Sequence, residues 1–133
     1  MAKIVLTTLN ARYIHSSLGL RYLYANMGEL QEETKLLEFS INQNTAELVD
    51  ELLAQEPLLI GFGVYIWNSP QTLELIRMIK ESRPDIIIVC GGPEVSFYPD
   101  GHPLIEISDH IVRGEADLSF SKLCNNLLVH QSS

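Results

Sequence analysis

Positive charge is scarce in this sequence. Nine Lys and Arg residues stand against 17 Asp and Glu residues, so the formal net charge is -8 in 133 residues. Proteins that bind nucleic acids usually carry a basic patch, because much of their affinity comes from neutralising phosphates. The nearest approach to such a patch is Arg12 with Arg21, and it is sparse. We therefore expect no nucleic acid as a direct partner.

Long apolar runs and cysteines are also few. No run approaches the roughly 20 apolar residues that span a bilayer. The N-terminus MAKIVLTTLN lacks the longer apolar segment and the small-residue cleavage site of a signal peptide. The two cysteines, Cys90 and Cys124, end different apolar segments, which favours reduced and partly buried thiols over a disulfide. These absences predict a cytoplasmic protein with no membrane partner.

Apolar runs alternate with helical patterns along the chain. Runs typical of buried strands lie at 3–9, 34–40, 57–66, 86–90 and 110–114. The patterns between them place apolar residues on one helical face, beginning with Leu20, Leu23, Met27 and Leu30. This alternation predicts an α/β protein, a three-layer flavodoxin-like (Rossmann-like) fold with a five-stranded parallel sheet in the order 2-1-3-4-5. We expect one domain over 1–130 and a disordered tail at 131–133.

Helix starts are marked by candidate caps. Thr45 is the expected cap of the second helix, and Ser69 with Pro70 forms a standard start for the third. The third helix is expected to run through Lys80, and a closing helix follows from residue 116. The polar segment 99–109 is expected to hold only a single helical turn near 104–107 in place of a full fourth helix.

Ligands of such sheets bind beyond the carboxyl ends of the strands, where the strand order reverses. Four loops form that edge here, at 9–17, 63–69, 91–100 and 113–117. Aromatic residues are frequent in them: Tyr13, Tyr65, Trp67, Phe97 and Tyr98. They indicate either a cover over a broad apolar ligand or packing against neighbouring helices or another domain, and both readings stay open.

Several motifs of familiar α/β proteins are missing from these loops. A phosphoacceptor receiver domain needs acidic residues after the first and third strands and a lysine after the fifth. Thr7 with Thr8, Val64 and Arg113 stand there instead. The segment GFGVYIW supplies only the first two glycines of a dinucleotide fingerprint, and no phosphate-binding P-loop is present. A flavin site stays possible but matches poorly, because NARYIHSS has the serines of a flavin-phosphate loop but lacks its glycine.

Residue patterns alone do not predict a catalytic site. His15 is a lone loop histidine with no second ligand at metal-site spacing, and such residues more often make simple polar contacts. Asn10 is of a type that braces loops. Glu94 and Glu115 lie on adjacent loop ends, but that placement does not establish a paired-carboxylate hydrolase. The doublet of Gly91 and Gly92 indicates either a plain turn or a ligand lying close to the backbone.

Four segments carry a resemblance to a known family. They are KIVLTTLNARYIHSSLGLRYLYANM, IGFGVYIWN, VCGGPEVSF and VRGEAD, each at one carboxyl-end loop. In this order they resemble the N-terminal cobalamin-binding domain of the cobalamin-dependent radical S-adenosylmethionine enzymes. In that family S-x-L-G-L-x-Y-L follows the first strand, GGP ends the fourth, and GE with a small residue follows the fifth. The resemblance covers almost the whole chain.

The resemblance implies cobalamin as the cofactor. The corrin ring would lie across the carboxyl edge, with the nucleotide tail between the sheet and the helices. Glycine and proline would let this ligand approach the backbone, and a glutamate would accept hydrogen bonds from ligand amides or neighbouring N–H groups. The implied cofactor-binding residues are Asn10, Tyr13, His15, Ser16, Tyr65, Ile66, Trp67, Gly91, Gly92, Pro93, Glu94, Gly114 and Glu115.

The first loop departs from a motif of related cobalamin domains. Mutases and methionine synthase carry D-x-H-x-x-G, whose histidine ligates cobalt. Here NARYIHSSLG has no aspartate before His15, and Gly19 stands four positions after His15 rather than three. We therefore expect no histidine or other protein metal ligand, with His15 or Tyr13 near the lower face of the corrin.

The family's catalytic motif is also missing. The chain has no C-x-x-x-C-x-x-C triplet, which holds the 4Fe-4S cluster and S-adenosylmethionine in that family. We expect a fragment of a longer enzyme that binds without catalysing and serves a C-terminal radical S-adenosylmethionine domain of the same polypeptide, with methyl transfer or related radical chemistry. If that domain covers the aromatic edge, the isolated chain should self-associate. The alternative is a non-catalytic flavodoxin-like interaction or regulatory domain, or a flavin-binding module.

Overall fold

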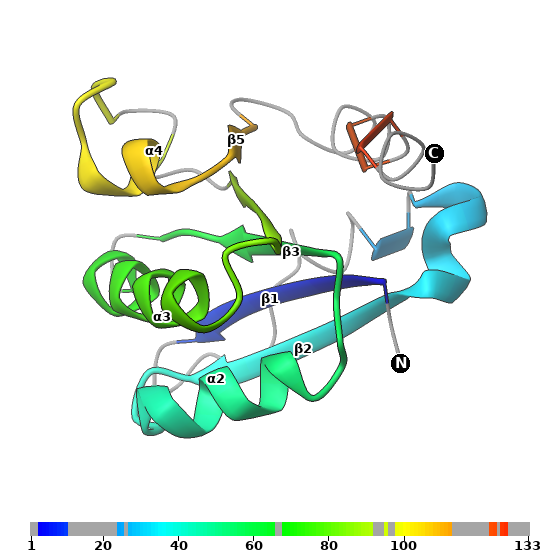
Figure 1. The fold of residues 1–133 in the computed structure, drawn as a ribbon, viewed down its shortest axis with the longest axis horizontal. Helices are drawn as coiled ribbons and strands as arrows, with labels where there is room; N and C mark the ends of the chain where they lie inside the picture. Colours follow the sequence, from blue (N-terminus) through cyan, green and yellow to red (C-terminus); the bar gives the residue numbers. More distant parts are fainter. Residues whose placement is uncertain are drawn as a thin grey trace.

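Five parallel strands form the centre of the protein (Figure 1). The computed structural model describes residues 3–10, 24–25, 27–65, 68–91, 95, 98–112, 123–124 and 126–127. Its elements are β1 (Ile4–Asn10), the 3-10 helix η1 (Gly28–Glu33), β2 (Thr34–Ser40), α2 (Thr45–Leu53), β3 (Leu59–Gly63), α3 (Ser69–Ser82), β4 (Ile87–Gly91), α4 (Pro103–Ile107) and β5 (His110–Ile111). The sheet order is β2-β1-β3-β4-β5, which confirms the predicted fold class and topology.

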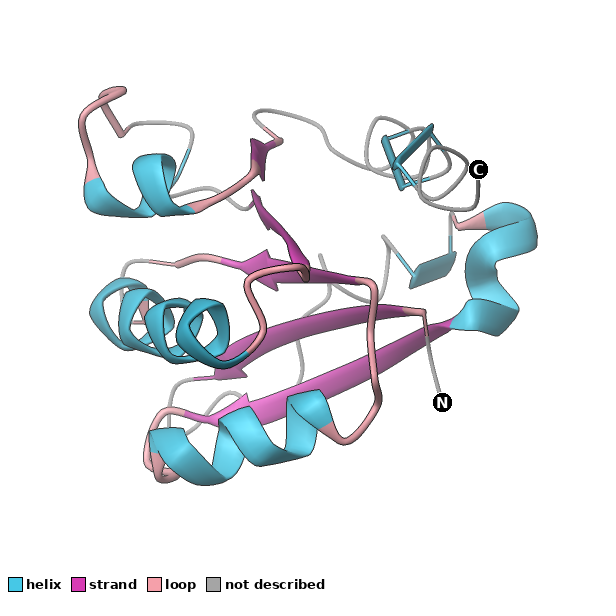
Figure 2. Cartoon of the chain, viewed as in Figure 1, coloured by secondary structure: helices cyan, strands magenta, loops and turns pink. Residues whose placement is uncertain are grey.

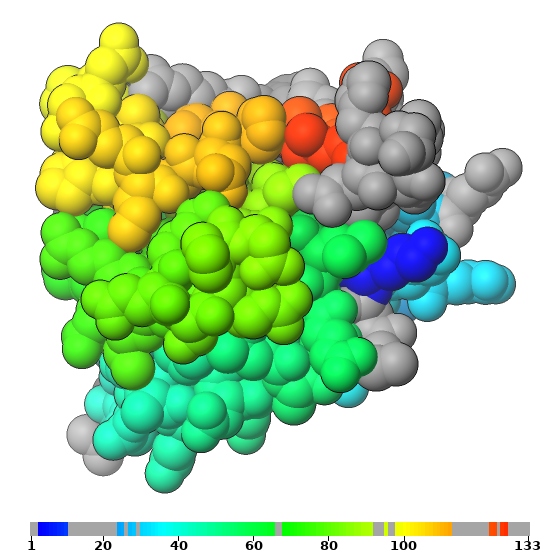
Figure 3. All heavy atoms as spheres, in the orientation of Figure 1, coloured from blue at the N-terminus to red at the C-terminus, as the bar shows by residue number. Residues whose placement is uncertain are grey.

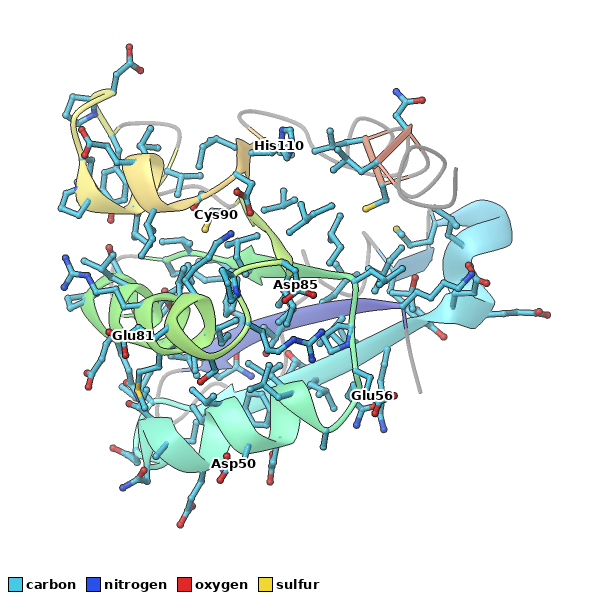
Figure 4. The ribbon with its side chains drawn as sticks, viewed as in Figure 1. Asp50, Glu56, Glu81, Asp85, Cys90 and His110 are labelled. Atoms are coloured by element: carbon cyan, nitrogen blue, oxygen red, sulfur yellow. The ribbon has the colours of Figure 1, made fainter. Side chains whose placement is uncertain are left out.

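One face of the sheet is covered by α2 and α3, which lie side by side (Figure 2). Apolar side chains of β1, β3 and β4 pack there against both helices and α4. The buried members include Val5, Leu9, Ile60, Phe62, Ile88, Leu48, Leu52, Leu75, Ile76, Ile79 and Leu104. Figure 3 shows α2, α3 and α4 as successive bands over this face. The outward side chains of the helices are polar, as Asp50 on α2 illustrates (Figure 4).

A second, smaller cluster lies on the opposite face. Successive side chains of a strand point to opposite faces, so the strand residues that alternate with those of the first cluster lie on this second face. Its buried members are Ile4, Leu6, Leu59 and Val89 from the strands, with Met27, Val112 and Cys124. Of the chain segments that cover this face, the structure describes short helical pieces at 24–25, 123–124 and 126–127. Strands buried on both faces account for the near-continuous apolar runs of the sequence.

Strand ends differ from the predicted bounds. The strand expected at 57–66 is confined to Leu59–Gly63, because the chain turns where the Asn68 side chain takes the Tyr65 N–H at 2.9 Å. The strand expected at 110–114 is assigned only to His110–Ile111, although Val112 N still donates to Cys90 O at 2.9 Å. Residues 113 and 114 lie outside the described part.

Both predicted caps were wrong by one residue. Asn44, not Thr45, caps α2, because its backbone is extended and its Oδ1 accepts from Ala46 N at 2.8 Å and Glu47 N at 3.4 Å. Asn68, not Ser69, occupies the cap position of α3 and makes no side-chain cap bond. Its amide is used elsewhere, as described below. The helix also runs two residues beyond Lys80, to Ser82.

The predicted first helix is only partly described. Met27 and Leu30 lie on the cluster of the second face, as expected from their spacing. They lie in or beside the 3-10 helix η1, and Gly28 has φ +60°, a left-handed conformation that does not continue an α-helix. Leu20, Leu23 and the expected tail at 131–133 lie outside the described residues. The single turn expected near 104–107 is confirmed as α4.

The last strand is positioned by an ion pair that is partly exposed. Asp109 Oδ2 accepts from Ile88 N at 2.7 Å and lies 2.7 Å from Lys80 Nζ. One carboxylate therefore joins β4, α3 and the start of β5, which explains how a strand of two residues keeps its register.

No helix within the described residues is long and apolar enough to cross a membrane.

Both cysteines are free thiols, and both are fully buried where partly buried thiols were predicted. Figure 4 shows Cys90 inside the protein, where its sulfur lies 3.0 Å from Ser108 Oγ. Burial raises the pKa of each thiol from an ordinary 9.0 to about 12. Because the thiolate is the nucleophile, neither cysteine should react readily near neutral pH.

We predict that iodoacetamide at pH 8 leaves both thiols of the native chain unmodified, whereas the urea-unfolded chain is alkylated at both. Mass spectrometry of the quenched samples measures this. The raised pKa means that the folded state holds the thiol protons more tightly, so stability should also fall as pH rises from about 9 towards 12. Native alkylation of Cys90 at the rate of the unfolded chain would contradict the burial.

Candidate functional site

The carboxyl edge contains a row of residues with little or no side chain. Thr8 of β1 pairs with Gly63 of β3, and Gly63 pairs with Gly91 of β4. Strand alternation places all three on the face of the second cluster. Leu6 and Val89, two residues earlier on β1 and β4, lie on the same face. The row crosses between β1 and β3, where the strand order reverses and ligands of such sheets bind. We refer to Thr8, Gly63 and Gly91 as the bare row.

The two glycines of the bare row have different surroundings. A Cβ atom at Gly63 would lie 3.3 Å from Thr8 Oγ1 and 3.5 Å from Tyr65 Cε2, so the backbone is closely lined there. A Cβ atom at Gly91 would meet Val112 O at 3.5 Å, which is ordinary contact. Both glycines are partly exposed. The backbone of β3 and β4 is thus partly exposed at these two positions, with Tyr65 and Thr8 beside Gly63 and Val112 beside Gly91.

Asn68 fastens the loop after β3 to the end of β1. Its Nδ2 lies within hydrogen-bond distance of Leu9 O at 3.0 Å, Thr8 Oγ1 at 3.2 Å and Gly63 O at 3.2 Å. Its Oδ1 accepts from Tyr65 N at 2.9 Å. Asn68 is fully buried. Since buried polar groups need partners, this one amide determines where the loop turns beside the bare row.

Thr8 is oriented by the same network. Its hydroxyl donates to Gly63 O at 2.7 Å and accepts from Asn68 Nδ2. These two bonds fix the threonine rotamer against the neighbouring strand. The floor at the strand-order reversal is therefore rigid before any ligand arrives, which reduces the ordering cost of binding.

A polar pair extends the edge towards β2. Asn10, 6% exposed, donates from Nδ2 to Glu38 Oε1 at 3.3 Å. Glu38 is the register partner of Thr8, so it continues the line of the bare row by one strand. Asn10 was predicted as a brace or cofactor contact, and its observed partner is this carboxylate.

The aromatic residues divide into two groups where they are described. The Tyr65 ring lies beside Gly63, at the bare row. Tyr98 instead donates to Ser69 Oγ at 2.6 Å, stacks on His102 with ring centroids 3.7 Å apart, and packs on the α2/α3 face. His102 is fixed in turn because its Nδ1 accepts from Leu104 N at 3.1 Å. Packing against neighbouring helices therefore accounts for Tyr98, whereas Tyr65 lies at the bare row.

Three of the sequence-predicted site residues are described. Asn10, Tyr65 and Gly91 come from three different strands or loops and all lie at the carboxyl edge. The other ten fall outside the described residues: Tyr13, His15, Ser16, Ile66, Trp67, Gly92, Pro93, Glu94, Gly114 and Glu115. Three residues were missed. Gly63 and Thr8 could have been found from strand alternation, and Asn68 from its place just before Ser-Pro.

The described residues offer no site for direct metal ligation. No group of three or more His, Cys, Asp or Glu side chains that could hold a metal ion occurs among them. Thr7 Oγ1 is a buried polar atom without a hydrogen-bond partner, but strand alternation directs it to the α2/α3 face. It therefore does not face the bare row.

Comparison with known proteins identifies the family of the chain. The family model described as B12 binding domain matches residues 4–123. A curated relative is the cobalamin-dependent radical SAM methyltransferase TokK of Streptomyces tokunonensis, 28% identical over 81 residues, which make up 58% of this chain and 11% of that protein. The chain thus spans about a tenth of the length of this relative.

Two solved structures share the fold. One is the apo cobalamin-dependent S-adenosylmethionine radical enzyme OxsB, with a TM-score of 0.69 and 18% identity over 93% of this chain and 18% of that one. The other is a cobalamin-binding protein from Desulfitobacterium hafniense DCB-2, with a TM-score of 0.65 and 20% identity over 94% of this chain and 58% of that one. At these identities the likeness shows the architecture alone.

Proposed function

The chain belongs to the B12-binding domain family, and from this premise we propose that it is the cobalamin-binding domain of a radical S-adenosylmethionine enzyme that transfers methyl groups. The family match over residues 4–123 is the observation that carries the proposal. The relative TokK, a cobalamin-dependent radical SAM methyltransferase by name, supports the reaction class. Its much greater length supports a catalytic domain elsewhere in the same polypeptide as the partner.

The described edge fits this cofactor. Cobalamin is broad and carries a nucleotide tail, so it needs a wide area of accessible backbone rather than a deep hole. The partly exposed Gly63 and Gly91 would supply such backbone on β3 and β4, beside the buried Thr8 of β1. The Asn68 network holds its floor in place. The buried apolar cluster on the same face, including Leu6 and Val89, adjoins the bare row.

We assign the residues of this chain to binding rather than catalysis. Gly63 and Gly91 would admit the cofactor to the backbone, and Tyr65 would border it beside Gly63. In the same proposal the remaining loop residues complete the enclosure: Tyr13, His15, Ser16, Ile66, Trp67, Gly92, Pro93, Glu94, Gly114 and Glu115. His15 takes a place near the corrin without bonding to cobalt, because its spacing to Gly19 does not match the histidine-ligating motif.

The division of labour follows from what the chain contains. Cobalamin supplies a cobalt centre on which a methyl group can be carried. The residues named above hold and orient it and exclude water. The sequence has no cysteine triplet for an iron–sulfur cluster, so in this proposal the cluster and S-adenosylmethionine belong to the second domain. The isolated chain would therefore bind cobalamin without catalysing methyl transfer.

We expect the purified 133-residue chain to retain hydroxocobalamin through desalting, with the corrin visible spectrum at close to one equivalent per chain. Flavin mononucleotide, added in a parallel sample, should elute free. Absence of retained corrin, with flavin retained instead, would overturn the proposal in favour of a flavin-binding module. Retention of neither would favour an interaction or regulatory domain.

A further inference from the structure

We propose that Ser69 is a positioning residue for the cofactor and that it acts through Tyr98. The inference deepens the proposed function and rests on it. The Tyr98 hydroxyl donates a hydrogen bond to Ser69 Oγ at 2.6 Å, and this bond joins the segment after β3 to the segment after β4. Both segments belong to the carboxyl edge. We refer to the bond between Ser69 and Tyr98 as the loop clasp.

The two segments are joined at both ends. Where they begin, Val64 N donates to Gly91 O at 2.8 Å, one residue beyond the last paired residue of β3. Further along, the loop clasp joins the first residue of α3 to Tyr98. A single attachment would leave each segment free to pivot about it, whereas two attachments fix their separation. The loop clasp therefore sets how far apart the two segments lie.

The tyrosine ring of the loop clasp is also held from α4. It stacks on His102 with ring centroids 3.7 Å apart and ring planes 4° apart. His102 is the N-cap of α4, and its Nδ1 accepts from Leu104 N at 3.1 Å. Leu104 is buried in the core, and α4 contacts α3 (Figure 1). The hydroxyl is thus presented to Ser69 from a fixed ring, so little side-chain entropy is lost when the bond forms.

The start of α3 thereby holds the ends of three strands. Asn68 bonds to β1 at Leu9 O and to β3 at Gly63 O. The next residue, Ser69, holds the segment after β4 through the loop clasp. Strand order reverses between β1 and β3, which is where ligands of such sheets bind. Two adjacent side chains therefore determine how three of the loops at this edge are placed relative to one another.

Proposed cofactor-binding residues lie between the two attachments. Tyr65 is one of them, and its ring lies beside Gly63. Those that fall between the same attachments in the sequence are Ile66, Trp67, Gly92, Pro93 and Glu94. A ligand that touches both segments needs them at one separation, and a separation fixed beforehand lowers the ordering cost of binding. Ser69 thus contributes to affinity without touching the cofactor.

Removing the loop clasp should weaken cofactor binding about three- to tenfold, the net effect of one neutral hydrogen bond. We expect this loss when Ser69→Ala is titrated with hydroxocobalamin and followed by the visible spectrum. Tyr98→Phe, which keeps the stacked ring, should show an equal loss. The double variant should lose no more than either single variant, because both remove the same bond. Ser69→Thr keeps a hydroxyl and should bind like the parent chain.

Thr34→Val is the matched control for a hydroxyl with a purely structural role. Thr34 Oγ1 donates to Leu30 O at 2.7 Å, and Thr34 pairs with Ile4 at the end of β1 far from the carboxyl edge. This variant should lower the urea midpoint of unfolding, as Ser69→Ala does, and leave the affinity for hydroxocobalamin unchanged. An equal loss of affinity in Thr34→Val would show that affinity merely follows stability, and would overturn the positioning role.

Hydrogen exchange of the unliganded chain tests the loop clasp without the cofactor. Tyr98 N donates to Val95 O at 3.3 Å, and His102 N donates to Pro99 O at 3.0 Å. We expect both amides to exchange about three- to tenfold faster in Ser69→Ala than in the parent chain, because local opening becomes easier once the bond is lost. Nuclear magnetic resonance measures the two rates. Unchanged rates would overturn the loop clasp.

The binding results separate this inference from the proposed function. If the parent chain binds no cobalamin, the proposed function falls, and the positioning role falls with it. If the parent chain binds and Ser69→Ala binds equally tightly, the inference alone is wrong. Losses that add in the double variant would mean that Ser69 and Tyr98 act separately. That result would overturn the inference, and so would a threonine variant that binds as weakly as the alanine variant.

Discussion

Replacing Asn68 with alanine is expected to lower the free energy of unfolding by about 3–5 kcal/mol. The side chain is fully buried and its amide bonds to Leu9 O, Gly63 O and Tyr65 N. Alanine would leave these backbone groups without their partner in a place that water enters poorly. Such a loss is a large fraction of the roughly 5–15 kcal/mol that stabilises a domain. Urea denaturation of the purified chain measures it.

The matched control for this prediction is another asparagine beside a helix. Asn44 caps α2 through Ala46 N and Glu47 N, but it is exposed. Asn44→Ala should therefore lower the free energy of unfolding by only about 1 kcal/mol. A loss for Asn68→Ala no larger than for Asn44→Ala would mean that water replaces the buried amide, and that the loop after β3 is not fixed by this residue.

Replacing Gly91 with leucine is expected to weaken cobalamin binding about 10- to 100-fold, since forced overpacking costs about 1–3 kcal/mol. The new side chain would lie on the face of the bare row, where the backbone is partly exposed. The Cβ of the new side chain fits, because it would meet Val112 O at an ordinary 3.5 Å. Titration with hydroxocobalamin gives the affinity, and thermal unfolding of the unliganded chain gives the stability.

Gly91→Ala serves as the graded control for the cobalamin experiment. It adds only the Cβ whose surroundings are known, so its loss of affinity should fall between those of the parent and the leucine variant. If Gly91→Leu binds cobalamin as tightly as the parent chain, the cofactor does not lie against β4 at this point. A loss of binding accompanied by unfolding of the unliganded chain would instead show that Gly91 is a packing residue.

The stacked pair of Tyr98 and His102 illustrates where sequence reasoning could not decide. Both the ligand-cover and the packing readings were open for the loop aromatics. The choice depends on which helix approaches the loop, and only the folded chain brings Ser69 of α3 within 2.6 Å of the Tyr98 hydroxyl. Tyr65 has the same residue type and a similar loop position but lies at the bare row.

The cap assignments failed for a related reason. Asn, Ser and Thr are all good caps, so the segments NTAE and NSPQ each present two adjacent candidates. Local propensity cannot separate them. In α2 the backbone angle at Asn44 decides the matter. In α3 the asparagine occupies the cap position while its side chain bonds to β1 and β3, a use that no local pattern encodes.

Alternation of apolar runs with helical patterns by itself determined the fold class, and the rule of right-handed crossovers determined the strand order, because both depend on periodicities that are local in the chain. The family resemblance likewise depended on short segments read in order. Tertiary structure alone decided which residues meet at the carboxyl edge. Thr8, Gly63, Gly91 and Glu38 are far apart in the sequence, and they form one row only because parallel pairing sets their register.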